Sequence, residues 1–288
     1  MSLNLSVDMN LNGRRESSNV SDRRGQRGGA GLKLGGGIGA VIIAALIAWL
    51  SGGTPLDIIS AGMGQFDSVS SQQDYTPSAE EEALATFSRK ILAGTEDVWT
   101  KLFAEKGLEY TPPTLVLFTD AVSSGCGNAT SATGPFYCSA DETVYIDLSF
   151  FTQMHSTLGA DGDFAYAYVI AHEVGHHVQH LLGTLEDAHS RMSRMSEADA
   201  NRVSVALELE ADYYAGVWAH HDNKMFGSLE PGDIEEAIDA AQKIGDDYLQ
   251  KKARGYSVPD SFTHGTSSQR MKALQQGLAS GRFTRYAQ

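Results

Sequence analysis

Two histidines and one glutamate in the middle of the chain have the spacing of a zinc site. His172, Glu173 and His176 stand in the order His-Glu-x-x-His. On an α-helix, residues four apart share one face, with Cβ atoms about 5–6 Å apart, so both imidazoles can bind one ion at Zn–N distances of about 2.0–2.1 Å. Glu173 follows the first histidine and can reach the attacking water, as a general base does. The pattern predicts metal-assisted hydrolysis of an amide.

A third ligand is predicted on a second helix. A catalytic zinc takes three protein ligands and keeps one position open. Glu208 and Asp212 are again four residues apart. We expect Glu208 to complete the ligand set around one Zn²⁺ per chain, and Asp212 to accept the free N–H of a ligating histidine. The alternative is that Glu208, Glu210 and Asp212 form a solvated helix face, but their apolar neighbours argue against it, because unpaired carboxylates are costly there.

The motif is short and also occurs by chance in proteins that are not enzymes, so its surroundings matter. Its flanking residues 169–171 and 174–175 carry no charge, which suits a buried helix rather than a solvated one. Gly175 lowers helix propensity by about 1 kcal/mol relative to alanine. Close approach of a neighbouring backbone would explain a glycine at this position.

Helices and a few strands are predicted to position these residues. Ser78 and the acids after it are typical of a helix start, and apolar residues at three- to four-residue spacing extend the helix to about Glu105. Runs rich in β-branched and aromatic residues predict strands at 114–119 and 143–148, and the pattern is mainly helical after them. The sequence therefore predicts an α+β fold, mainly helical with a small β-sheet, over residues 78–288.

The chain contains two cysteines, Cys126 and Cys138, in a stretch rich in glycine, serine and threonine. One disulfide formed in an oxidising compartment would close a loop and contribute about 2–3 kcal/mol. Two unrelated thiols are the alternative. The spacing alone leaves both open.

The residues before the folded domain are interpreted as a tail, an anchor and a linker. Residues 1–33 carry six Lys/Arg and three acids, lack apolar periodicity and are predicted to be a disordered basic tail. Residues 34–53 form a mainly apolar, uncharged stretch that is just long enough to cross a membrane as one helix, which takes about 20 apolar residues. A buried core helix and a cleaved signal peptide fit less well, because glycines open the stretch and a long leader precedes it. Residues 54–77 are predicted to be a linker.

The distribution of charge predicts both topology and partners. The Lys/Arg excess before the apolar stretch predicts a cytoplasmic N-terminus and a catalytic domain on the periplasmic or extracytoplasmic side of the cytoplasmic membrane. After the tail the chain carries 22 − 6 = 16 basic and 36 − 3 = 33 acidic residues. Nucleic-acid binding requires clustered Lys and Arg, so we expect no nucleic-acid partner.

The chain resembles the YpfJ-like family of predicted neutral zinc metallopeptidases, which are membrane-anchored HExxH zincins of bacteria. The resemblance implies a zincin-like fold and peptidase chemistry, and it leaves the substrate open. Tyr213 departs from the family pattern, which has cysteine after the motif's aspartate, but this position is not a ligand. The resemblance covers nearly the whole chain and lies in Gly13–Arg24, the apolar stretch, Ser131–Cys138, Val144–Phe150, the HExxH helix and Leu207–Trp218.

A further segment, Phe262–Leu274, resembles the Thr-His-Pro…Arg segment of HtpX-type and prenyl-protein-processing membrane peptidases. His264 and Arg270 keep the spacing of that segment, whereas Gly265 replaces the usual proline. The resemblance places His264 near the metal, where it could stabilise a developing oxyanion or occupy the open position of a resting form. The alternative is a surface histidine, with Arg270 capping a helix.

These observations together predict a zinc-dependent endopeptidase that hydrolyses protein or peptide substrates at or outside the cytoplasmic membrane. The strand from Val144 to Leu148 is the candidate edge strand, to which an extended substrate would add antiparallel. The principal alternative is a non-catalytic, membrane-tethered module that zinc stabilises for binding or assembly. An intact Glu173 argues against that alternative, since a structural site does not need a general base.

Overall fold

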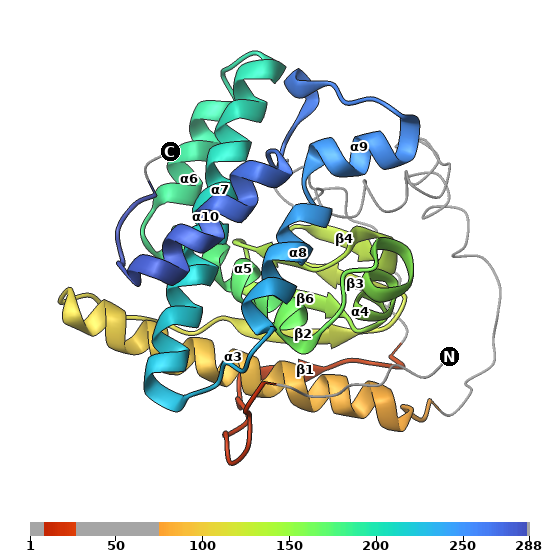
Figure 1. Cartoon of the computed structure of the whole chain (residues 1–288), viewed down its shortest axis with the longest axis vertical. Helices are drawn as coiled ribbons and strands as arrows, with labels where there is room; N and C mark the ends of the chain where they lie inside the picture. The colour runs from red at the N-terminus through yellow and green to blue at the C-terminus, as the bar shows by residue number, and fades with distance from the viewer. Residues whose placement is uncertain (1–8, 27–74, 287–288) are drawn as a thin grey trace.

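The computed structural model describes residues 9–26 and 75–286. A long helix, α3 (Ala79–Glu105), lies beside a small sheet (Figure 1). It shares one hydrophobic core with the sheet and with helices from the second half of the chain. Ser78 caps α3 by accepting the N–H of Glu81 with its side chain, as its sequence predicts. The fold is α+β and mainly helical, as predicted.

The main sheet has four strands in the order β1-β2-β6-β5. β1, β2 and β6 run parallel to one another, and β5 runs antiparallel to β6. A separate hairpin follows β2, and a disulfide joins Cys126 in its turn to Cys138 at the end of β5. The strands are β1 (Val20–Asp22), β2 (Thr114–Phe118), β3 (Ala121–Ser124), β4 (Gly127–Thr130), β5 (Phe136–Cys138) and β6 (Thr143–Asp147).

Seven helices follow the sheet in the described part of the chain. Two of them, α5 and α7, carry the predicted zinc motif and the predicted third ligand, and α10 packs along α7. Short 3-10 and π turns connect the longer elements at 131–133, 154–158 and 259–261. The helices are α4 (Ser149–Gln153), α5 (Asp163–Leu181), α6 (Thr184–Met192), α7 (Glu197–Phe226), α8 (Asp233–Lys243), α9 (Asp246–Arg254) and α10 (Ser267–Ser280).

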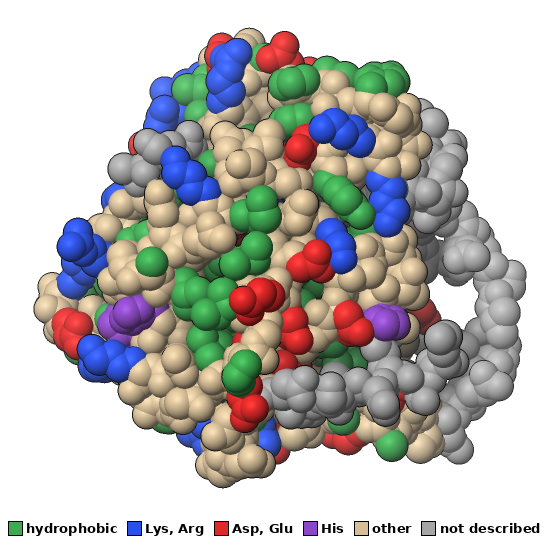
Figure 2. All heavy atoms as spheres, in the orientation of Figure 1, with side chains coloured by type: hydrophobic (Ala, Val, Ile, Leu, Met, Phe, Trp, Pro, Cys, Tyr) green, Lys and Arg blue, Asp and Glu red, His purple; other side chains and the backbone are tan. Residues whose placement is uncertain are grey.

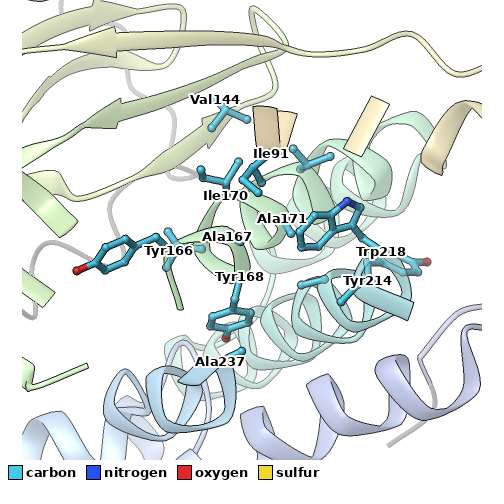
Figure 3. Close-up of a cluster of buried hydrophobic side chains, with 14 of the residues drawn as sticks. Ile91, Val144, Tyr166, Ala167, Tyr168, Ile170, Ala171, Tyr214, Trp218 and Ala237 are labelled. Atoms are coloured by element: carbon cyan, nitrogen blue, oxygen red, sulfur yellow. The ribbon is translucent and has the colours of Figure 1, made fainter. Parts of the chain in front are cut away.

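The core surrounds α5. On one side, Ile170 of α5 meets Ile91 of α3 and Val144 of β6, and on the other side Ala171 faces Trp218 and Tyr214 of α7 (Figure 3). Almost every residue of α5 from its start to Gln179 is buried. The uncharged flanks of the motif are therefore explained by burial of the helix on all sides.

The predicted disorder of residues 1–33 is wrong for residues 9–26. Residues 20–22 form β1, which pairs with β2 in the main sheet. Met9 and Leu11 are 2% and 5% exposed and belong to the core. The segment has too few apolar residues to fold alone, but it adds a strand to an existing sheet. The composition of a segment shows whether it can form a core alone, but not whether it packs against a distant part of the chain.

The predicted anchor at 34–53 and most of the predicted linker at 54–77 lie outside the described residues. Among the residues that the structure does describe, no helix is both long and apolar enough to span a bilayer. The anchor therefore stays a prediction.

The predicted substrate strand, Val144 to Leu148, is not at an edge of the sheet. β6 lies between β2 and β5, so its main-chain groups bond on both sides. The edge strand next to β6 is β5, which lies in the segment predicted to be a loop between the strands at 114–119 and 143–148. A run of three residues is too short for periodicity to show it.

The face that carries α8 and α10 has a mixed surface. Lys and Arg side chains are scattered toward its periphery, and acids and hydrophobic side chains lie between them (Figure 2). On this face the described residues form no continuous basic patch.

Candidate metal centre

Helices α5 and α7 pack closely enough to bring the two halves of the predicted site together. Gly175 makes this possible: a Cβ at this position would lie 2.9 Å from the carbonyl oxygen of Ala211 and 3.1 Å from its Cα. Both contacts involve backbone, which cannot move aside as a side chain can. Gly175 stands one residue before His176, and Ala211 stands one residue before Asp212, so this contact sets the separation of the functional side chains.

The three predicted ligands converge. Nε2 of His172 lies 3.2 Å from Oε2 of Glu208, and Nε2 of His176 lies 3.4 Å from Oε1 of the same carboxylate. One potential ligand atom from each residue lies within 4.8 Å of the others. The two imidazole rings are almost perpendicular, with an interplanar angle of 86°. Two histidines and a glutamate 32 to 36 residues further along the chain therefore surround one point.

His172 is oriented by Asp212. Nδ1 of His172 lies 2.8 Å from Oδ1 of Asp212. Arg270 donates to both oxygens of the same carboxylate, and Tyr168 donates its hydroxyl proton to Oδ1 at 2.6 Å. Because an ionised carboxylate only accepts, His172 carries a proton on Nδ1, so Nε2, which faces Glu208, is the nitrogen that could bind a metal.

His176 is oriented by Gln179, a residue that sequence analysis did not assign to the site. Nδ1 of His176 lies 2.9 Å from Oε1 of Gln179. The amide orientation of Gln179 follows from its other end, where Nε2 donates to the carbonyl oxygen of Leu207 at 2.8 Å. Since Oε1 can only accept, His176 also carries its proton on Nδ1 and directs Nε2 toward Glu208. Both imidazoles therefore present the same nitrogen.

The donor set fits a zinc ion. Nε2 of His172 and Oε2 of Glu208 are buried and have no hydrogen-bond partner among the described residues, although they lie close together. Buried polar atoms without partners are rare and costly, and a cation between them would satisfy both. Two imidazole nitrogens and one carboxylate are ligands that catalytic zinc sites use.

Electrostatics favour a cation at this point. Burial disfavours the charged form of His172, but Asp212 and Glu208 outweigh it and raise the pKa of His172 to about 10. Burial also opposes ionisation of Glu208, yet His176 and His172 hold its pKa well below the usual range. The excess negative charge thus attracts protons when no metal is bound. Metal binding would displace those protons.

Glu173 is placed as a proton acceptor beside the three ligands. Its side chain is buried, and burial raises its pKa despite the opposing effect of His172 and His176. A raised pKa brings a carboxylate closer to the working pH of a general base. Glu173 is absent from the group of converging ligand atoms, which leaves it available for that role.

His264 lies in the interior, which contradicts the alternative of a surface histidine. It is 1% exposed, and its Nδ1 lies 3.0 Å from Oδ1 of Asp246. Its Nε2 is buried without a hydrogen-bond partner among the described residues. The next residue, Gly265, packs against Val205 and Leu209, which flank Glu208 on α7. His264 therefore lies on the Glu208 side of the site, and Arg270 binds Asp212 instead of capping a helix.

Asp246 is a second residue that sequence analysis missed. Its Oδ2 accepts the backbone N–H groups of Thr263, His264 and Gly265 at 2.8, 2.7 and 3.1 Å. The side chain thereby fixes both the loop and the ring of His264. Asp246 is an acid in the first turn of a helix, a position where acids are common, so its residue type and position carry no signal of this role.

Comparisons with known proteins identify the family of this chain. A family model described as "Putative neutral zinc metallopeptidase" matches residues 9–286. The uncharacterized protein YpfJ of Escherichia coli K12 is 48% identical over 279 residues, which cover 95% of this chain and 96% of the relative. An uncharacterized protein of Mycobacterium tuberculosis H37Rv is 41% identical over 182 residues, or 60% of each chain. No solved structure matches the chain.

Proposed function

This chain belongs to that zinc metallopeptidase family, and on this premise we propose that it is a zinc-dependent endopeptidase acting on protein substrates. The observation that carries the proposal is the convergence of His172, His176 and Glu208 beside a buried Glu173. Two ligand atoms in this group lack any other partner among the described residues. A metal-stabilised structural site would need the ligands but not the adjacent glutamate.

The chain's own residues supply proton transfer. When bound, zinc would lower the pKa of a water toward 7 and polarise the scissile carbonyl. Glu173 takes the proton of the attacking water and returns it to the leaving amine. Its raised pKa suits both steps, because the group must hold the proton briefly and then release it. Asp212 and Gln179 keep the two imidazoles in the tautomer that presents Nε2.

His264 is proposed to stabilise the oxyanion that forms at the scissile carbonyl. Asp246 accepts from Nδ1, so Nε2 of His264 can donate only when both ring nitrogens carry a proton. Donors aimed at a developing oxyanion are among the largest contributions to catalysis. The alternative, that His264 occupies the open ligand position of a resting form, uses the same buried Nε2 and predicts a different effect of its removal.

The substrate is proposed to bind as an extended strand along β5. β5 is an edge strand of the main sheet and is bonded on one side by β6. Tyr137 of β5 bonds to Nδ1 of His177 on α5, one residue after the ligand His176. An extended peptide added to this edge would therefore run beside the catalytic helix. This mode favours unfolded or flexible segments of proteins.

The disulfide supports a location outside the cytoplasm. Cys126 and Cys138 are joined, and structural disulfides persist mainly in oxidising compartments. The bridge also joins the hairpin β3–β4 to β5, so it braces the proposed substrate edge.

The test combines metal analysis with peptide cleavage by the purified full-length protein. We expect one zinc per chain, cleavage of casein or a peptide library, and loss of cleavage with a chelator. Glu173→Gln should keep zinc at full occupancy and lose turnover. If Glu173→Gln cleaves as well as the parent, the proposed mechanism is wrong. If the parent binds zinc but cleaves nothing, the non-catalytic module is the better description.

A further inference from the structure

The first described segment, residues 9–26, is an integral part of the folded domain. Its strand β1 pairs with β2 from Val20 to Asp22. The ladder continues on both sides, where Leu115 donates its N–H to the carbonyl of Asn19 and Arg23 donates to the carbonyl of Leu117, both at 2.8 Å. Neighbouring strands in a sheet lie about 4.8 Å apart. Residues 9–26 and the rest of the domain must therefore occupy the same compartment.

Buried ion pairs extend this contact to α3 and α7. Arg14 donates to both carboxylate oxygens of Asp222 on α7, and the two side chains are 9% and 1% exposed. A Cβ at Gly94 of α3 would lie 2.6 Å from Nη2 of Arg14, so the glycine makes room for this arginine. Ser17 donates to the buried Glu96 of α3. Such complementary contacts distinguish a docked segment from a loosely attached tail.

The chain leaves and re-enters this domain at one point of its surface. A Cβ at Gly25 would lie 2.2 Å from Cγ of Tyr75, so the residues on either side of 27–74 are neighbours in space. Gly25 also donates its N–H to Oγ1 of Thr119 at 3.4 Å. Gly25 and Tyr75 therefore both lie beside the end of β2.

These contacts conflict with a single crossing by the apolar stretch at 34–53. One crossing would put residues 9–26 and 75–286 on opposite sides of a hydrocarbon core about 30 Å thick. No strand ladder or ion pair can span that distance. A neighbouring copy inserted in the same orientation cannot supply β1 either, because its own first segment would also be on the wrong side.

We infer that residues 9–26 and 75–286 of one chain lie on the same side of the membrane. The cytoplasmic N-terminus predicted from charge, with a catalytic domain on the opposite side, is then replaced by one common location for residues 9–26 and 75–286. The inference does not depend on peptidase activity, since it rests on the packing of β1 and Arg14.

Thiol labelling of the full-length protein in bacterial cells tests the inference. Ser18→Cys and Gln276→Cys place single thiols at exposed positions of the two flanks, and the disulfide keeps the native cysteines unreactive. Cells are treated with a membrane-impermeant maleimide before and after the cytoplasmic membrane is permeabilised. We expect the same response for both thiols. Labelling of one thiol before permeabilisation and of the other only afterwards overturns the inference. The parent chain reports background labelling.

A double-mutant cycle in native membranes gives a second, independent readout. Arg14→Ala and Asp222→Ala should each reduce protease resistance, and the double variant should lose less than the sum, because removing one partner leaves a buried charge in each single variant. Arg23→Ala combined with Asp222→Ala is the matched control, since Arg23 bonds to Ser21, and its effects should add. Additive effects for Arg14 and Asp222 would contradict a shared compartment.

Discussion

Arg270 donates two hydrogen bonds to Asp212, each 2.8 Å long, and the two side chains are 1% and 0% exposed. The same carboxylate holds Nδ1 of His172. A residue of α10 therefore controls the orientation of a proposed ligand on α5 through an acid on α7. The charge of Arg270 also helps hold the pKa of Asp212 at about 2, against the opposing effect of burial, so Asp212 stays ionised at any working pH.

Replacing Arg270 with methionine should destabilise the fold strongly. Asp212 would become a buried charge without its cation, and breaking such a pair typically costs about 3–5 kcal/mol. Urea unfolding in the presence of a chelator measures the loss without a contribution from metal. Arg270→Lys keeps the charge but loses the bidentate hydrogen bonding to Asp212, so it should destabilise the fold less than the methionine variant does. A methionine variant as stable as the parent would show that the pair does not hold α10 to α7.

Asp212→Asn should weaken zinc binding by about 10–100-fold, the usual effect of losing a partner that orients a ligand. An asparagine can still contact Nδ1 of His172, but it no longer favours the proton there. Competition with a fluorescent zinc chelator measures the affinity. Asp222→Asn is the matched control, because Asp222 is a buried acid of the same helix that binds Arg14. Equal losses in both variants would indicate a general effect of destabilising α7.

The ligands could be predicted from sequence because helical spacing alone places His172 beside His176. Glu208 was identifiable because an acid surrounded by apolar residues needs a partner. Gln179 and Asp246 could not be found in this way. Their functional contacts run to a neighbouring turn or to a loop far along the chain, and spacing contains no information about such contacts.

The errors in the fold have the same origin. The segment that contains β1 has the composition of a disordered chain. Its partners lie in α3, β2 and α7, and pairing between distant segments leaves no local sequence pattern. β5 is too short to show alternation, so the sequence pattern predicts β6 as the edge strand. Long periodic elements such as α3 were predictable from their own residues.

Gly175→Ala should reduce both stability and zinc affinity. The added methyl would meet the carbonyl oxygen of Ala211 at 2.9 Å, so α5 and α7 must separate, and overpacking of this kind typically costs about 1–3 kcal/mol. The increase of about 1 kcal/mol in helix propensity opposes this loss only in part. Thermal unfolding with and without zinc measures both effects. A variant more stable than the parent would mean that the helices can separate without cost.

The fold should lose stability in mild acid through His177. Burial lowers the pKa of His177 to about 4, whereas an unfolded chain titrates near 6.5. The unfolded state therefore binds more protons between these values, and stability falls as the pH decreases from about 6.5 to 4. The difference between these two pKa values corresponds to about 3 kcal/mol of folding stability. This contribution is fully present above pH 7.

A comparison of His177→Gln with the parent isolates this contribution. Urea unfolding at pH 7.5 and pH 4.5, with a chelator present, should show a smaller acid loss in the variant. The variant should be less stable at pH 7.5, because His177 bonds to Tyr137 and to the carbonyl oxygen of Thr111. Parallel pH profiles for the two proteins would exclude His177 as the source.

Removing the side chain of His264 distinguishes its two possible roles. If Nε2 stabilises the oxyanion, His264→Ala should lower kcat by about 10²–10³-fold, as loss of one such donor does, and leave zinc affinity unchanged. If the ring instead occupies the open ligand position, the same variant should bind zinc more weakly, and its kcat should not fall.

The two outcomes require zinc affinity and kcat to be measured on the same preparations. His155→Ala is the control, since His155 is an exposed histidine paired with Asp161 at the surface, and neither quantity should change. We expect the first outcome, because Nε2 of His264 is absent from the converging group formed by His172, His176 and Glu208. His264 lies close enough to Glu208 to help lower the pKa of that carboxyl without completing the ligand set, as expected of an oxyanion donor.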